Sequence, residues 1–210
     1  MKKKCLSLLL IISVFIVFFT GCSKETGFST SDIIRIIEQY GIKETRNIEE
    51  VKFNRKPGSG YYVSKNRSEA QNLYTDICDS YSFDSYKTFV VNEIVYGSIV
   101  EDITEDLPSS SFIYIVFKNK DDARKFYEGE KEIEDYPGVD KIHEENNGFL
   151  YTIYTENNSD GTIETGGLYL QDNKVFLVNC QNAVRDYKTG FANYIIFEIG
   201  DIIAGRKTTS

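Results

Sequence analysis

The stretch FIYIVFKNKDDARKFY, residues 112–127, decides the fold class of this chain. Its first six residues form a continuous apolar run of strand length. Asn119 follows as a helix N-cap, and Ala123, Phe126 and Tyr127 then recur at helical spacing. The stretch therefore predicts a strand that leads directly into an amphipathic helix.

A similar unit stands 53 residues earlier, so that residues 61–76 match residues 114–129. Its helix begins behind Asn66, an N-cap, with Glu69 three residues further on. Because any strand followed by a capped helix draws on the same residue types, the match predicts a repeated strand-helix unit without establishing a duplication. The matching pairs are Tyr61 and Tyr114, Val63 and Val116, Lys65 and Lys118, Asn66 and Asn119, Ala70 and Ala123, and Tyr74 and Tyr127.

Apolar periodicity and turn signals define further elements. Residues 32–40 have helical spacing, and Gly41 follows where a helix commonly ends. Residues 157–161 and the pair Asp172-Asn173 are typical of hairpin turns. Residues 187–203 return to helical spacing and predict a deeply buried helix, for which a strand from Tyr194 to Ile199 is the alternative.

Helices mixed with hairpins favour an α+β fold class, with amphipathic helices packed on a mostly antiparallel sheet. No internal linker forces a boundary, so a single domain is predicted over residues 31–210. The predicted strands cover residues 51–54, 61–65, 88–103, 112–117, 149–155, 162–170 and 175–180.

The N-terminal region has the order of a secretory signal. Lysines at positions 2–4 precede an almost wholly apolar run over residues 6–19, which is shorter than the about 20 residues of a membrane span. With Thr20-Gly21-Cys22, this region resembles the bacterial lipoproteins, whose signal is cut just before a cysteine that carries diacylglycerol. Phe19 departs from the Leu, Val or Ile usual there. The alternative is an ordinary signal or an uncleaved anchor, with Cys22 incidental.

The resemblance implies that residues 1–21 are a signal peptide and that Cys22 is the site of lipid attachment. Two or more acyl chains, such as palmitate, make attachment to membrane lipid durable. Residues 22–30 read as a flexible polar tether, which keeps the folded domain within about 15–20 Å of the bilayer. The expected location is therefore the cell membrane, on its extracytoplasmic face.

Removal of the signal makes the chain strongly acidic. The 24 Lys and Arg residues lose the three signal lysines, and the remaining 21 face 32 Asp and Glu residues, which gives a net charge of −11. An acidic surface repels phosphate backbones, so nucleic acid is not expected as a partner. The location favours an envelope protein instead.

Cys78 and Cys180 are the two cysteines left after the signal and the lipid site. In an exported protein an even number favours a disulfide, and closing a loop of 102 residues would stabilise the fold by about 4–5 kcal/mol. Cys78, however, lies on the apolar face of a predicted helix, where a free cysteine behaves as a small hydrophobe. A disulfide and two unpaired core thiols therefore both stay open.

His143 is the only histidine, and Glu144 and Glu145 follow it. Adjacent residues on a strand point to opposite faces, so the three do not converge on a metal, and an exposed polar loop is predicted here. A nucleophilic pair of Cys180 and His143 would suit a thiol hydrolase, but no nucleophile motif surrounds Cys180. No catalytic residue is therefore predicted.

Residues 156–163 superficially follow the first positions of an EF-hand calcium loop, with Glu156, Asn158 and Asp160 as candidate ligands. The twelfth position, which should supply a bidentate Glu, is Gly167, and the flanks are typical of strands instead of helices. A hairpin turn is the preferred interpretation. The sequence thus predicts neither a metal nor a cofactor.

Residues 117–127, with the hairpin strands and the Ile-rich segment that follow, resemble uncharacterised lipoproteins of low-GC Gram-positive bacteria. Those proteins have no established activity, so the resemblance carries over no functional residue. The expected function is a binding or interaction module at the cell envelope. The alternatives are an envelope hydrolase that acts on peptidoglycan or peptides, and a small-ligand-binding lipoprotein.

Overall fold

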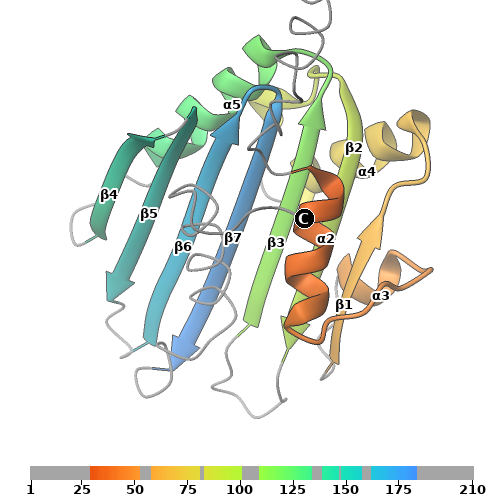
Figure 1. Ribbon diagram of the computed structural model, residues 1–210, viewed down its shortest axis with the longest axis horizontal. Coiled ribbons are helices and arrows are strands. Elements are labelled where there is room, and N and C mark those ends of the chain that lie inside the picture. Colours follow the sequence, from red (N-terminus) through yellow and green to blue (C-terminus); the bar gives the residue numbers. More distant parts are fainter. Residues whose placement is uncertain are drawn as a thin grey trace, which may run out of the picture.

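The computed structural model describes residues 29–52, 58–80, 83–100, 109–133, 139–146, 148–157 and 162–183. These residues form one seven-stranded antiparallel sheet of order β1-β2-β3-β7-β6-β5-β4, with helices on both faces (Figure 1). The predicted α+β class is confirmed. The strands are β1 (Gly58–Val63), β2 (Val91–Val100), β3 (Ser109–Phe117), β4 (Val139–Asn146), β5 (Phe149–Asn157), β6 (Thr162–Gln171) and β7 (Lys174–Ala183). The helices are α2 (Thr30–Gln39), α3 (Glu49–Lys52), α4 (Arg67–Ser80), α5 (Lys120–Ile133) and the 3-10 turn η1 (Asp84–Tyr86).

Strand β3 is the centre of the sheet and is apolar on both faces. Phe112 and Tyr114 pack in the core on the α2 side, whereas Ile113, Ile115 and Phe117 pack in the core under α4 and α5. Each of these five side chains is at most 2% exposed. Since a strand that is apolar on both faces must be covered on both, the helices have to divide between the two sides.

Helix α2 covers the front face, across β2 and β3 (Figure 1). Its N-terminus is a capping box: the Ser29 hydroxyl accepts from the Asp32 N–H at 3.3 Å, and the Asp32 carboxylate accepts from the Ser29 N–H at 3.0 Å. Ile33, Ile36 and Ile37 are at most 1% exposed and join the front core. The predicted helix over 32–40 is confirmed.

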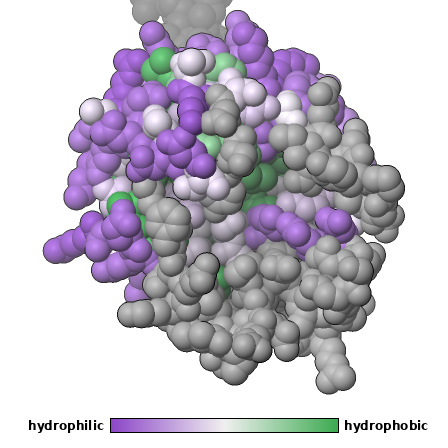
Figure 2. Space-filling model, turned by 180° about the vertical axis from the view of Figure 1, so that it is seen from behind, coloured by the Kyte–Doolittle hydropathy of each residue, from purple (hydrophilic) through white to green (hydrophobic). Residues whose placement is uncertain are grey.

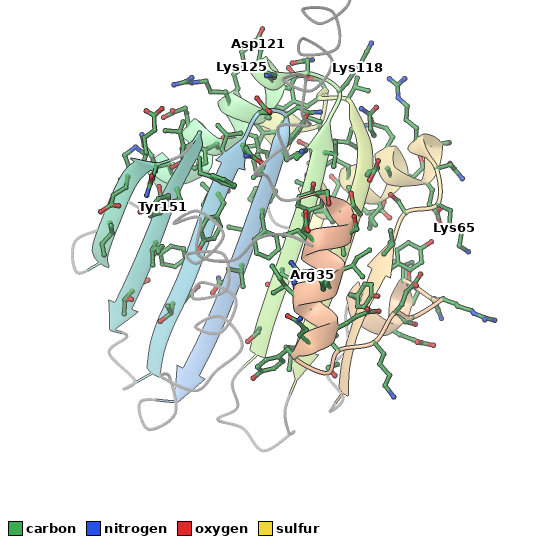
Figure 3. All side chains as sticks on the ribbon, viewed as in Figure 1. Arg35, Lys65, Lys118, Asp121, Lys125 and Tyr151 are labelled. Carbon is green, nitrogen blue, oxygen red and sulfur yellow. The ribbon has the colours of Figure 1, made fainter. Side chains whose placement is uncertain are left out.

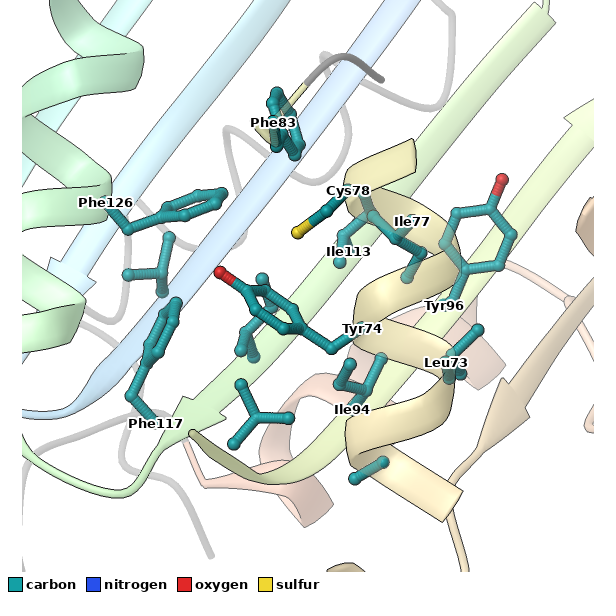
Figure 4. Close-up of a cluster of buried hydrophobic side chains, with 14 of the residues drawn as sticks. Leu73, Tyr74, Ile77, Cys78, Phe83, Ile94, Tyr96, Ile113, Phe117 and Phe126 are labelled. Carbon is teal, nitrogen blue, oxygen red and sulfur yellow. The ribbon is translucent and has the colours of Figure 1, made fainter. Parts of the chain in front are cut away.

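Helices α4 and α5 cover the back face. Aromatic rings from these helices, from β3 and from the η1 region meet in the back core (Figure 4), where Tyr74 packs edge-on against Phe117 at 5.8 Å and Phe83 against Phe126 at 5.5 Å. Seen from behind, the coloured part of the surface is mostly hydrophilic, with small separate hydrophobic areas, one of them near the centre (Figure 2). No helix in this described part of the chain is long and apolar enough to cross a membrane.

The two strand-helix units are built alike. The Asn66 side chain accepts from the Glu69 N–H at 3.0 Å to cap α4, and the Asn119 side chain accepts from the Asp122 N–H at 2.8 Å to cap α5. At each of two further matching positions the side chains are fully buried, Ala70 with Ala123 and Tyr74 with Tyr127. The repeated unit seen in the sequence is thus a repeated piece of structure.

The predicted strand over 51–54 is wrong at its start. Val51 lies in the short helix α3, because the Asn47 side chain accepts from the Glu49 N–H at 3.1 Å and begins a helical turn. Val51 is 3% exposed, so its apolar character reflects burial against β1 and β2 and not a strand of its own.

The polar loop predicted around His143 is also wrong, because these residues form the edge strand β4. An edge strand with exposed side chains on both faces has no apolar alternation to reveal it. The predicted hairpins are confirmed: β5 pairs with β6, and Asp172-Asn173 joins β6 to β7 with Asp172 at a φ of 55°. The segment predicted as a buried helix, 187–203, lies outside the described residues.

Replacement of Asn119 by Ala removes the side-chain acceptor at the start of α5. We expect Asn119→Ala to lower the free energy of unfolding by about 1 kcal/mol. Asn72→Ala, at an exposed position within α4, is the matched control and should change stability by less than about 0.5 kcal/mol. Urea unfolding of both variants measures this, and an equal loss in the two would contradict the assigned cap.

Candidate functional site

The two edges of the sheet differ in how they are finished. At the β1 edge, residues 43–45 run alongside the strand: the Tyr61 N–H donates to the Lys43 carbonyl at 3.1 Å, and the Thr45 N–H donates to the Tyr61 carbonyl at 2.8 Å. This segment occupies part of the backbone edge that β1 would otherwise present. Covering an edge in this way protects it from pairing with other chains.

At the opposite edge, β5 is the only strand of the described residues that pairs with β4. Residues 142–146 all have exposed side chains, and Ile142 is 55% exposed. Ile142 is the exposed large hydrophobic residue of the described part of the chain. We call Ile142, His143, Glu144, Glu145 and Asn146 the β4 edge.

The β4 edge presents different groups on its two sides. Glu144 pairs in register with Tyr151, whose hydroxyl donates to the Glu144 carboxylate, and Tyr151 packs against the front core (Figure 3). This hydrogen bond to a carboxylate raises the pKa of Tyr151 to about 12. Strand alternation then places Ile142 on the front with Glu144, and His143 with Glu145 on the back. Each side of the edge therefore carries one glutamate.

His143 is tied to the protein by two hydroxyl groups. Its Nδ1 atom lies 3.1 Å from Tyr127 Oη and 3.1 Å from Thr152 Oγ1, and these two oxygens are 3.0 Å apart. Tyr127 comes from α5, and its burial raises its pKa to about 12. These three side chains connect β4, β5 and α5 through hydrogen bonds at one point.

The structure does not bring His143 and Cys180 together. They lie on β4 and β7, which β5 and β6 separate, so three strand spacings of about 4.8 Å stand between the two backbones. Along the ladders, Cys180 is aligned with Thr165 and Thr155, and through them with Asp140, three residues from His143. The nucleophilic pair that would suit a thiol hydrolase is not formed by this sheet.

Cys78 is a free thiol in the back core, and it is fully buried (Figure 4). Burial raises its pKa to about 11, against which a hydrogen bond with Tyr74 acts only in part. Because the thiolate is the reactive form, such a thiol is chemically inert in the folded protein. The side chain of Cys180 lies outside the described side chains, and Cys22 lies outside the described residues.

Glu130 brings a carboxylic acid into the back of the molecule. It is 8% exposed, and its Oε1 atom has no hydrogen-bond partner. Burial raises its pKa from 4.5 to about 7, and a hydrogen bond with Tyr86 opposes the rise. The acid is thus mostly neutral below about pH 7, and its ionisation inside the protein costs free energy.

Two recesses open near β1. One of about 440 Å³ lies between residues 43–46, α3 and β1, and it has Lys43, Arg46 and Glu50 in its lining. The other, of about 480 Å³, lies between Ile48 and α4. Tyr62 and Leu73 line this second recess together with the carboxylates of Glu69 and Asp76.

Of the candidate calcium loop, residues 158–161 lie outside the described residues. Strands β5 and β6 flank it and pair as far as Asn157 and Ile163, as the hairpin interpretation predicts. Over the described ranges, no group of three or more His, Cys, Asp or Glu side chains is placed to hold a metal ion.

No protein-family model and no curated protein matches this chain. Among solved structures, it is similar to the extracellular domain of PknH from Mycobacterium tuberculosis, with 14% sequence identity over 86% of this chain and 92% of that chain. The TM-score of this match is 0.41. At this level the likeness identifies neither the fold family nor the function.

The burial of Cys78 makes its reactivity predictable. In the folded mature protein, we expect iodoacetamide at about pH 8 to leave Cys78 unlabelled, because a pKa of about 11 leaves little thiolate. After unfolding in urea without reductant, the same residue should be fully labelled, as peptide mass mapping would show. Labelling that requires a reductant would instead establish a disulfide.

Glu130 makes stability depend on pH. Its folded pKa of about 7 exceeds the ordinary 4.5, so its destabilising effect is absent below about pH 4.5 and complete above about pH 7. At about 1.4 kcal/mol per pKa unit, Glu130→Gln should stabilise the protein by about 2–3 kcal/mol more at pH 8 than at pH 4.5. Urea unfolding at both pH values measures the difference. Glu145→Gln, at an exposed position, should show none; an equal effect would contradict the burial of Glu130.

Proposed function

We propose that this chain is a lipid-anchored protein of the extracytoplasmic membrane face that acts as an interaction module. Its binding element is the β4 edge, onto which an extended segment of an envelope protein adds as a further strand. In this mode of recognition the main-chain hydrogen bonds supply affinity, and the side chains beside them supply specificity.

The difference between the two sheet edges carries this proposal. Residues 43–45 cover part of β1, whereas Ile142 is 55% exposed on β4. A long exposed edge with an apolar side chain is a template for pairing with another chain. Among the described residues, residues 43–45 cover part of the β1 edge, and none pairs with the outer side of β4.

The N-terminal sequence supports the membrane location. Thr20-Gly21-Cys22 matches the lipoprotein signal. The predicted tether ends before Ser29, the N-cap of α2, and its residues 22–28 would hold the domain within about 13–16 Å of the bilayer. A partner anchored in the same membrane would then meet the β4 edge at a high effective concentration. Modest intrinsic affinity is sufficient under these conditions.

The second recess favours a second candidate function, the binding of a small ligand. Tyr62 and Leu73 provide apolar area there, and the Tyr62 hydroxyl donates to Glu69, which lowers the pKa of that carboxyl. A ligand with an amine and a short apolar body would match these groups. A ligand-dependent rise in melting temperature that Leu73→Ala abolishes would support this function.

Photocrosslinking in cells tests the interaction module. With p-benzoylphenylalanine at position 142, we expect the native lipoprotein to capture one envelope protein reproducibly, because the apolar ring replaces an exposed apolar side chain at the edge. The same group at position 46, which is exposed near β1 at the opposite edge of the sheet, is the matched control. Mass spectrometry identifies the captured protein.

A Cys22→Ala variant provides the second control. Without the anchor, capture from position 142 should fall strongly, since the protein no longer shares a membrane with its partner. Equal capture from positions 142 and 46, or none from either, would contradict the β4 edge as the binding element. Undiminished capture by Cys22→Ala would contradict the role of the anchor.

A further inference from the structure

We infer that the segment bound at the β4 edge is basic, with two adjacent Lys or Arg residues followed, two positions on, by an apolar residue. This inference rests on the proposed function, because it names the chemistry of the strand that the β4 edge would accept. Three features of the described residues carry it: a regular backbone edge, a glutamate on each side of that edge, and one apolar contact point.

The backbone of β4 is regular enough to accept a strand. All eight of its residues pair with β5 in continuous register, from Val139 opposite Glu156 to Asn146 opposite Phe149. By contrast, the ladder between β2 and β3 shifts register between Val91 and Glu93. In a regular antiparallel ladder every second residue directs its N–H and C=O to the neighbour, so the other residues of β4 direct theirs outward.

The charge of the β4 edge is negative on both sides. Glu144 lies on the front and Glu145 on the back, and both are exposed. Tyr151 donates a hydrogen bond to the Glu144 carboxylate, which holds that carboxylate beside the strand. Opposite charges on directly facing residues of paired strands stabilise the pair, whereas like charges destabilise it. A bound strand therefore needs two adjacent basic residues opposite these two glutamates.

The apolar contact point lies two residues before Glu144. Ile142 is 55% exposed and pairs in register with Ile153 of β5, which is half-buried. The two side chains form an apolar step on the front face that a third apolar residue from an added strand would extend. Burial of apolar surface stabilises a complex by roughly 25 cal/mol per Å², so an apolar residue in register with Ile142 would strengthen binding.

A second copy of this chain fits the edge less well than a basic segment. The mature chain carries a net charge of −11, so two copies repel each other before any ladder forms. Pairing β4 with itself about Ile142 would also set Asp140 opposite Glu144 twice. A basic segment meets no such repulsion, and the negative charge of the whole protein attracts it and raises its association rate.

Peptide binding tests the inference on the mature full-length lipoprotein in non-ionic detergent micelles. The probe is the fluorescein-labelled peptide STKKTVTS, which in antiparallel register sets Lys-Lys opposite Glu145 and Glu144 and Val opposite Ile142. The comparison peptide is STEETVTS. At about 0.15 M salt, where the screening length is about 8 Å, we expect anisotropy to give at least tenfold tighter binding of the lysine peptide.

Two double variants of equal charge change separate the site from general electrostatics. Glu144→Lys with Glu145→Lys should reverse the preference between the peptides. Glu49→Lys with Glu50→Lys, an exposed adjacent pair on α3, should leave both affinities within twofold. Hydrogen exchange should also slow in residues 139–146 when the lysine peptide is bound, and not in residues 58–63.

The other outcomes overturn the inference in distinguishable ways. An equal loss in both double variants, or no difference between the two peptides, would show that charge at the β4 edge does not select the partner. Concentration-dependent dimers that Ile142→Pro abolishes would assign the edge to a second copy, because proline removes a backbone donor from the edge. If photocrosslinking from position 142 still captures a partner, the interaction module stands and only the basic chemistry fails; if it captures none, both fail.

Discussion

The burial of β3 on both faces is the constraint on which the rest of the structure depends. Phe112 and Ile113 point to opposite sides and are both essentially inaccessible, so neither face of the sheet can be left to water. Helix α2 covers one face of the sheet, and α4 and α5 cover the other. One side of β3 is hydrogen-bonded to β7, whose residues 174–181 come from the far end of the described chain. Closure of the sheet therefore depends on contacts that are distant in sequence, which makes assembly slower than local hairpin formation.

The same local unit reaches two different outcomes in this fold. The unit of β1 and α4 returns to β2, the direct neighbour of β1, whereas α5 carries the chain past three strands to β4. At matching positions, the Tyr74 hydroxyl donates to the Tyr86 carbonyl at 3.1 Å, while the Tyr127 hydroxyl meets His143 and Thr152. Tyr74 therefore bonds within the back core in the first unit, whereas Tyr127 in the second unit forms hydrogen bonds with the edge strand β4 and its neighbour β5. The position of β4 at the edge follows directly from this longer crossover.

An exposed strand edge requires protection against pairing with other chains. On β4 the exposed charged side chains supply it, because Glu144 and Glu145 discourage pairing with other acidic strands. The same charges would accept a basic strand, so protection against self-association and selection of a partner have one physical origin. On β1 the chain uses residues 43–45 for protection, and two recesses open beside that segment. The two edges of the sheet therefore differ in chemistry: β4 exposes acidic side chains and Ile142, whereas two recesses lie near β1.

Local patterns in the sequence determined α2, α4, α5 and most strands, but not α3. Asn66 and Asn119 cap their helices through the residue three positions on, and the isoleucines of α2 recur at helical spacing. Both kinds of pattern are visible in the sequence. The edge strand β4 escaped prediction because exposure removes apolar alternation, although Asn147-Gly148 after it is a strong hairpin signal. Only the tertiary structure decided which strands are neighbours, and with that the separation of His143 from Cys180 and the exposure of Ile142. The reason is that a strand's own side-chain pattern records how many of its faces are buried, and not which strand lies beside it.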